Sequence, residues 1–83
     1  MENNIFPLTH LKEGEAGMIS SIVSGWQAAK RLADLGLTAG TQIKVIRKAQ
    51  ISGPLQIEIK GSKLALGKGI ASKILVKQLK NGQ

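Results

Sequence analysis

The chain has 83 residues and a formal net charge of +7, so one small basic domain with a marginal hydrophobic core is expected over residues 1–83. The sequence contains no Cys, which excludes disulfides, thiol chemistry and zinc-finger ligation. No apolar run is long enough to cross a bilayer, and the N-terminus lacks the basic and apolar regions of a signal peptide. We therefore expect a soluble chain that is not exported.

The N-terminal segment predicts little regular structure. Residues 1–5 read as a loose end, and residues 7–11 as a single helical turn. In that turn Leu8 and Leu11 are three residues apart and lie on one side, while Thr9 is a candidate cap.

Residues 17–23 suit a β-strand, although Ile19 and Ile22 break strict alternation, which predicts a β-bulge there. Ser24 and Gly25 then open a helix of about ten residues, which depends on packing because helices this short are marginal on their own.

The apolar positions of this helix recur at helical spacing, and we expect Ala28, Leu32 and Leu35 to form its inner face. The residues expected outside that stripe are Lys30, Arg31 and Asp34. Trp26 lies near the helix start, where we expect its side chain to be half-buried against the rest of the domain.

The exit from the helix carries the densest set of local signals. Gly36 lacks a Cβ and tolerates the left-handed conformation that often follows a helix. With Gly36 in that role, Leu32 and Leu37 take the two positions that touch in a Schellman cap. Gly40 offers a second permissive turn before the next strand. These signals specify a structural corner and carry no catalytic chemistry.

The second half of the chain alternates with period two, as strands do. Strands are predicted at residues 42–48, at 55–60, around Leu64 and Leu66, and at 74–77, with a loop at 49–54, a tight hairpin turn at Gly61-Ser62 and one helical turn at 70–73. Five short strands with one helix after the first predict a mainly β fold with short helices, a small SH3-like β-barrel. Closure of the barrel would leave no free strand edge.

The ordered set of motifs resembles the FeoA family, the small ferrous iron transport protein A. The matching segments are Leu8-Thr9-His10-Leu11-Lys12-Glu13-Gly14, then Arg31-Leu32-Ala33-Asp34-Leu35-Gly36-Leu37 with Gly40, then Gly53-Pro54, Gly61, Leu64-Ala65-Leu66, Ala71 and Ile74-Leu75-Val76. Ala39 departs from the family pattern, in which Pro or an acidic residue often precedes the second Gly.

The resemblance implies an SH3-like barrel in the cytoplasm that regulates ferrous iron uptake by binding the cytosolic GTPase part of a FeoB-type permease, without enzyme activity or a cofactor. The candidate contact residues are Lys30, Arg31, Leu37, Thr38, Ile51, Ser52 and Pro54. For Leu37 we favour packing in the core. A similar domain occurs in iron-dependent repressors, so a metal-responsive regulatory domain is an open alternative.

The net charge leaves two other partners to weigh. An anionic membrane surface would attract each nearby Lys or Arg by about 1 kcal/mol. A nucleic acid would also be attracted, but single-strand binding needs aromatic stacking platforms, and the chain has only Phe6 and Trp26. We therefore do not expect nucleic acid as the partner, and a homo-oligomer stays open.

Metal binding and catalysis find little support in the residue types. His10 is the one His, and without Cys no transition-metal site is expected, although Glu13 and Glu15 could join it in an adventitious site between two copies. The Ser residues form no nucleophile motif, and no pair of acidic residues suggests an acid and a base.

Overall fold

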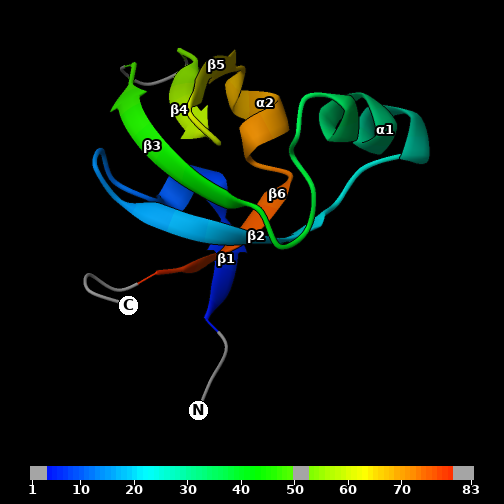
Figure 1. Cartoon of the computed structure of the whole chain (residues 1–83), viewed down its shortest axis with the longest axis horizontal. Helices are drawn as coiled ribbons and strands as arrows, with labels where there is room; N and C mark the ends of the chain where they lie inside the picture. The colour runs from blue at the N-terminus through cyan, green and yellow to red at the C-terminus, as the bar shows by residue number, and fades with distance from the viewer. Residues whose placement is uncertain (1–3, 50–52, 80–83) are drawn as a thin grey trace.

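The computed structural model describes residues 4–49 and 53–79 (Figure 1). Its described residues form one antiparallel sheet of six strands in the order β1-β6-β2-β3-β4-β5. The elements are β1 (Ile5–Pro7), the 3-10 helix η1 (Leu8–His10), β2 (Ala16–Ile22), α1 (Trp26–Asp34), β3 (Gln42–Lys48), β4 (Leu55–Ile59), β5 (Ser62–Leu66), α2 (Lys68–Ala71) and β6 (Ile74–Gln78).

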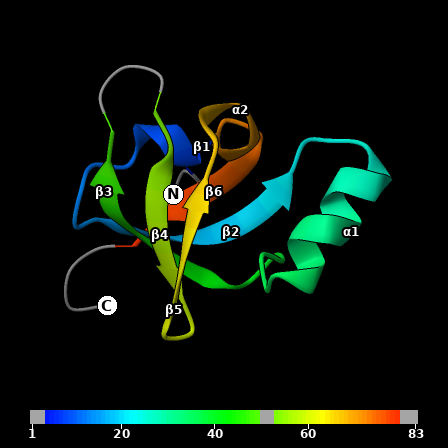
Figure 2. The ribbon, with the colours of Figure 1, turned by 90° about the horizontal axis from the view of Figure 1, so that it is seen from above.

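The sheet curves around the core, as the predicted mainly β, barrel-like fold requires (Figure 2). It does not close, because β1 and β5 stand at the two ends of the strand order. The expectation of a sheet without free edges is therefore wrong. A free edge can pair with a strand of another chain, and a short edge strand limits such pairing. The edge strand β1 has only three residues.

The strand β1 was not predicted, since Ile5 was assigned to a loose end. Ile5, Phe6 and Pro7 pair with Lys77, Val76 and Leu75 of β6. Three residues are too few to show alternation, and Pro7 argues against a strand except at a sheet edge, which is where β1 lies.

The β-bulge in β2 is confirmed. The pairing of β2 with β6 shifts register between Ile19 and Ser21, so Ile19 points into the core while the strand bends. A second shift lies in β3 between Val45 and Arg47. These bends let short strands wrap around a small core.

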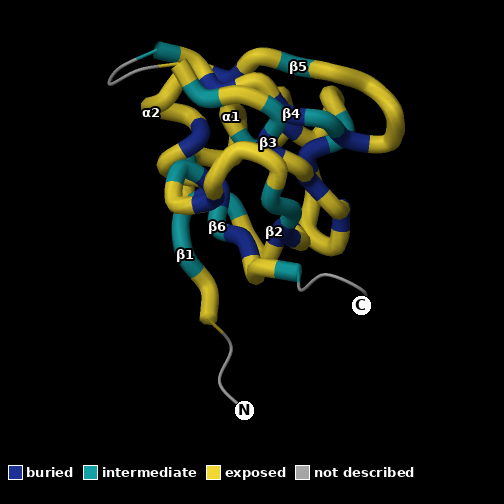
Figure 3. Tube along the Cα trace, turned by 90° about the vertical axis from the view of Figure 1, so that its left-hand side faces the viewer, coloured by how far each residue is buried: buried dark blue, intermediate teal, exposed yellow. Residues whose placement is uncertain are grey.

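The core is almost entirely aliphatic. Figure 3 marks the buried positions along the chain in dark blue. The buried hydrophobic residues are Leu8, Leu11, Ile19, Leu32, Leu37, Ile43, Val45, Leu55, Ile57, Ile59, Leu66, Ala71, Ile74 and Val76. They come from both helices, from η1, from five of the described strands and, for Leu11 and Leu37, from the connections, so a single cluster joins the whole domain.

The turn at the start of the chain is held differently from the prediction. Leu8 and Leu11 are both buried, as expected, but the cap position of η1 is Pro7 and carries no side-chain hydrogen bond. The ammonium group of Lys48 instead donates to the carbonyl oxygens of Thr9 (2.8 Å) and Leu11 (3.0 Å). A residue nearly forty positions away thus satisfies this turn, which local sequence could not reveal.

The hairpin between β4 and β5 turns one residue earlier than predicted. Ile59 pairs with Ser62, so Lys60 and Gly61 form the two-residue turn. Both have positive φ, at 48° and 80°, as a type I′ turn requires. The clean alternation of β4 continues through Lys60, so the pattern alone could not place the end of the strand.

The predicted Schellman cap at the end of α1 is confirmed. The N–H of Leu37 donates to the carbonyl of Leu32 (2.9 Å), and the N–H of Gly36 donates to the carbonyl of Ala33 (2.9 Å). Gly36 has φ +93°, and both leucines are buried in the core. The cap therefore fixes the end of α1 to the domain.

Replacing Gly36 with Ala should lower the free energy of unfolding by about 1–2 kcal/mol, because Ala disfavours positive φ. The added Cβ would also lie 3.3 Å from Cδ1 of Ile59. The matched control is Gly69→Ala in α2, where open space surrounds the new Cβ and a gain of about 0.4–1 kcal/mol is expected. Urea unfolding followed by circular dichroism measures both, and a neutral Gly36→Ala would contradict the role of the cap.

Candidate functional site

Helix α1 stands at one side of the molecule, outside the curved sheet (Figures 1 and 2). Of its predicted inner stripe only Leu32 is buried, whereas Ala28 is exposed and Leu35 is 50% exposed. The prediction that all three residues pack inward is therefore wrong for two of them. The Schellman cap fastens the C-terminal end of α1, and the rest of its apolar stripe remains uncovered.

That uncovered stripe forms one wall of a groove of about 290 Å³. The other wall comes from the end of β5, the β5–α2 connection and α2. The lining residues are Ser24, Ala28, Arg31, Leu32, Leu35, Ala65, Leu66, Gly67, Ile70 and Lys73. Leu35 on one wall and Ile70 on the other, which is 47% exposed, give the groove accessible apolar surface on both sides.

The charged residues of the groove are all positive. Arg31 and Lys73 are among its lining residues, and no acidic residue is among those that the structure describes there. The backbone of Lys73 is tied to the end of β2, because its carbonyl accepts a hydrogen bond from the N–H of Val23 (2.8 Å). Lys30 is exposed on α1 next to Arg31. The groove is therefore an apolar surface with a cationic margin.

Those predicted partner-contact residues that the structure describes do not form one surface. Lys30 and Arg31 are exposed on α1, as expected, and Arg31 reaches the groove. Pro54 is exposed directly before β4, and β4 begins on the side of the sheet away from α1 (Figures 1 and 2). Ile51 and Ser52 lie outside the described residues.

The corner after α1 contributes less contact surface than predicted. Leu37 is completely buried, so its side chain packs in the core and is not available to a partner. Thr38 is exposed, and its hydroxyl lies 3.1 Å from that of Thr41. The N–H of Gly40 donates to the carbonyl of Ile19 (2.8 Å), which ties this corner to β2.

Sequence reasoning missed the groove because its walls come from distant segments. Leu35 was assigned to the core, and neither Ile70 nor Lys73 was considered for a site. One signal was present, since α1 is a short helix with an apolar stripe, and a small domain has little core to cover it. The pattern showed which side chains share a face, but not whether anything packs against them.

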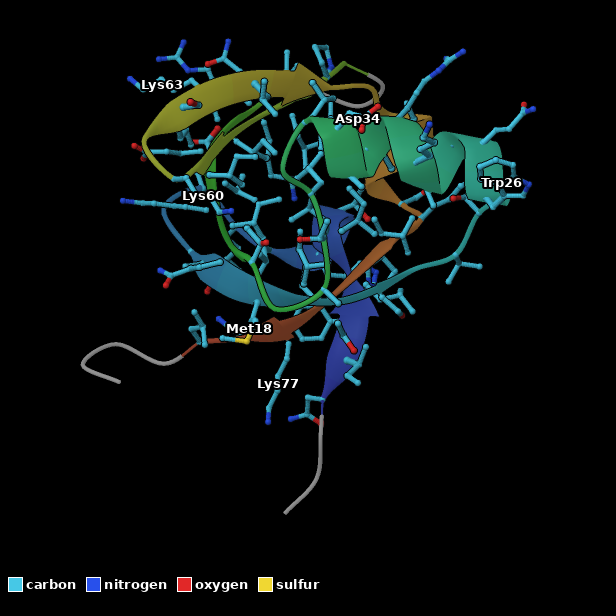
Figure 4. All side chains as sticks on the ribbon, turned by 45° about the vertical axis from the view of Figure 1, so that its right-hand side comes forward. Met18, Trp26, Asp34, Lys60, Lys63 and Lys77 are labelled. Carbon is cyan, nitrogen blue, oxygen red and sulfur yellow. The ribbon has the colours of Figure 1, made fainter. Side chains whose placement is uncertain are left out.

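Trp26 also departs from the prediction. Its side chain is 74% exposed and lies at the end of α1 farther from the capped corner, where Figure 4 shows it at the margin of the molecule. The expectation that it packs against the domain is wrong, because α1 approaches the core only through Leu32 and the cap that follows.

A second, wider hollow of about 520 Å³ lies near the β4–β5 turn. Its lining residues are Ala39, Gly40, Thr41, Gln42, Lys44, Glu58, Lys60 and Gly61. Lys44 lies directly opposite Glu58 in the strand register, so charges of both signs meet there. None of the charged residues that line this hollow is buried. Its mixed charges therefore favour a particular kind of ligand less clearly than the groove does.

The groups considered for an adventitious metal site are engaged elsewhere. His10 stacks on Phe6, with ring centroids 5.9 Å apart. Glu13 accepts a hydrogen bond from the N–H of Lys48, and Glu15 accepts one from the N–H of Lys12. In the described part of the chain, no three His, Cys, Asp or Glu side chains come together as a metal ion would require.

None of the helices in residues 4–49 and 53–79 has the length and apolar character that crossing a bilayer demands. The curved six-stranded sheet, the short helices and the groove beside α1 define a small SH3-like β-domain with an apolar groove. Residues 6–78 match the FeoA domain, and the chain belongs to the FeoA family. The expected family and fold class are thereby confirmed.

Relatives of known name and structure agree with this assignment. The chain is 40% identical over 78 residues to the “Putative Fe(2+) transport protein A” of Methanocaldococcus jannaschii, covering 94% of this chain and 93% of that protein. The crystal structure of an iron uptake regulatory protein, FeoA, superposes with a TM-score of 0.85 at 33% identity, covering 92% of this chain and all of that one.

A more distant structure supports the fold alone. FeoA of Stenotrophomonas maltophilia, solved with zinc and described as a procaryotic SH3 domain protein, is 20% identical. Its TM-score is 0.76, and the match covers 92% of this chain and 98% of that one. The SH3-like description therefore extends to the architecture of this chain.

Proposed function

We propose that this protein is a non-catalytic accessory protein of ferrous iron uptake, which acts in the cytoplasm by docking on the cytosolic GTPase part of a FeoB-type permease. The family assignment and the named relative support the role in iron transport. The observation that carries the docking mode is the apolar groove between α1 and α2, whose walls remain accessible in the isolated chain.

The chemistry of the groove defines its occupant. Leu35 and Ile70 expose apolar surface that gains free energy when it leaves water, at roughly 25 cal/mol per Å². Arg31, Lys73 and the neighbouring Lys30 favour acidic groups on whatever covers that surface. The proposed occupant is therefore a segment of the permease that presents an apolar side chain flanked by Asp or Glu.

The predicted contact residues divide accordingly. Lys30 and Arg31 belong to this docking surface, and Thr38 is exposed beyond the end of α1. Leu37 takes no part, since it is buried. Ile51, Ser52 and Pro54 stay a separate predicted contact. In this role the domain makes or breaks no covalent bond, because it acts only by binding to the permease.

Nucleic-acid binding is the competing reading of the positive charge. Of the two aromatic residues suited to base stacking, Phe6 packs partly buried against the core, so only Trp26 is freely exposed. A single exposed ring is a poor platform for a strand of bases. Salt-titrated binding to DNA and RNA separates the readings, and specific retention at physiological salt would contradict the proposal.

Calorimetric titration against the soluble GTPase part of the permease tests the docking mode. Ile70→Gln should weaken binding by about tenfold or more, since it places a polar group on an apolar wall of the groove. Arg31→Glu should weaken binding similarly by reversing a charge that faces an acidic partner.

Two matched variants control for loss of apolar surface or of charge elsewhere. Met18→Gln alters an exposed apolar residue of β2, and Lys63→Glu reverses a charge on β5 that does not line the groove. Both should bind within about twofold of the original chain. Equal weakening by test and control variants would place the contact on another face.

A further inference from the structure

The most exposed apolar residues of the described chain lie together at the tip that enters α1. Trp26 is 74% exposed and Val23 is 59% exposed, more than any other large hydrophobic residue described. Val23 directly follows β2 and Trp26 is the first residue of α1, with only Ser24 and Gly25 between them. Figure 4 shows Trp26 at the outer end of the helix, away from the sheet.

This tip lies beside the docking groove and is not part of it. Neither Val23 nor Trp26 lines the groove, although Ser24 does. Neither residue belongs to the core cluster or to the partly buried hydrophobic residues packed against it. The tip therefore contributes little to the fold, and its exposure has no structural explanation within the chain.

Two lysines lie next to the tip. The hydrogen bond from the N–H of Val23 to the carbonyl of Lys73 places these two residues side by side. Lys30 follows Trp26 by four residues, so the two are neighbours on the surface of α1. The first turn of the helix contains no acidic residue, and Asp34 lies at its opposite end (Figure 4).

A Trp side chain with an aliphatic neighbour and flanking Lys residues suits the interface between a lipid bilayer and water. The indole ring has an apolar body and a polar N–H, and it prefers the boundary between lipid tails and water. Lys residues beside it pair with anionic headgroups, while their stems lie along apolar surface. This combination adds an anchor to the general attraction that a net charge of +7 provides.

We infer that the tip formed by Val23 and Trp26 inserts into the interfacial layer of a bilayer that carries anionic lipids, with Lys30 and Lys73 on the headgroups. Insertion orients the domain, because the docking groove adjoins the tip and is then held next to the membrane surface. The inference does not depend on the proposed function, since it concerns a different partner and rests on Val23 and Trp26, which do not line the groove. Lys30 and Lys73 lie next to both surfaces, so only the Trp26 variant separates the two partners.

The sequence supplies its own probe for this inference. Trp26 is the single Trp and the chain has no Tyr, so intrinsic emission reports the tip alone. On addition of vesicles made of phosphatidylcholine and phosphatidylglycerol in equal parts, the emission should shift to the blue. Lipids brominated on their acyl chains should then quench it. Phosphatidylcholine vesicles should produce neither change, and high salt should reverse both.

Vesicle co-sedimentation with variants tests the residues. Trp26→Ala should weaken binding by about tenfold or more. Lys30→Gln and Lys73→Gln should each weaken it by about fivefold. The matched controls are Met18→Ala, near the start of β2, and Lys63→Gln on β5. Figure 4 shows both side chains far from Trp26, and both variants should leave binding unchanged. All of these residues are exposed, and circular dichroism checks that each variant stays folded.

Three results would overturn the inference. Unchanged emission with anionic vesicles would show that the tip stays in water. Equal vesicle binding by Trp26→Ala and the original chain would assign binding to another surface or to charge alone. A blue shift that grows with protein concentration in the absence of lipid would identify a second copy of the chain as the occupant. None of these results bears on titration of the groove with the permease.

Discussion

Replacing Leu37 with Ala should lower the free energy of unfolding by about 2–5 kcal/mol, the largest loss expected from a single substitution here. Leu37 is completely buried, and it also supplies one half of the hydrophobic contact in the Schellman cap. A domain of this length has a total stability of roughly 4–12 kcal/mol. The variant should therefore lose a large part of the stability of the domain.

Urea unfolding followed by far-ultraviolet circular dichroism measures this loss, since Trp26 is exposed and its emission reports little of the core. The matched control is Leu35→Ala, which removes the same atoms two positions earlier from a half-exposed side chain. Its cost should stay below about 1 kcal/mol. Equal costs for the two variants would show that the corner after α1 is not anchored in the core as described.

Replacing Gly17 with Val should cost about 1–3 kcal/mol, even though Val is the better strand former. A Cβ at Gly17 would lie 3.1 Å from the carbonyl oxygen of Lys77 and 3.2 Å from Cβ of Val76. Cδ1 of Leu11 would lie 3.3 Å away. Gly17 is on β2, between β6 and β3, so the backbone at this position has little freedom to move.

The same unfolding experiment measures this cost. Gln56→Val supplies the control, because Gln56 is exposed on β4 and a Val there should change the stability by no more than about 0.5 kcal/mol. If Gly17→Val were as stable as the original chain, the close approach of β2 and β6 would be wrong.

Local chemistry explains why part of the fold could be predicted. The sequence around Gly36 specifies the cap because its hydrogen bonds and its hydrophobic contact all lie within six residues. The bulge near Ile19 and the strand β3 also follow from short-range patterns. These features depend on neighbours in the chain, which the sequence displays directly.

The sequence predictions are wrong where contacts between segments far apart in the chain determine the structure. The exposure of Leu35 and Trp26 depends on how far α1 stands from the sheet, which its own amphipathic pattern does not state. Lys48 satisfies the turn at Thr9 through contacts across the fold. The strand β1 exists because β6 offers a partner, and its own three residues give no signal.

In the candidate site, too, local sequence predicts some features, whereas contacts between distant segments determine others. Lys30 and Arg31 were predicted to be exposed because charged residues opposite an apolar stripe face solvent. The groove itself needs Ile70 from α2 to face Leu35 from α1, and these residues are 35 positions apart in the sequence. No periodicity connects them, so only the structure could bring them together.

Chemical-shift mapping provides the most direct test of the central claim, that the groove beside α1 is the surface by which this domain binds its partner. The ¹⁵N-labelled chain is titrated with the unlabelled soluble GTPase part of a FeoB-type permease. We expect the largest amide shifts on α1 and on the residues from Ala65 to Ile70. Shifts centred on Lys44, Glu58 and Lys60, or no shifts at saturating partner, would contradict it.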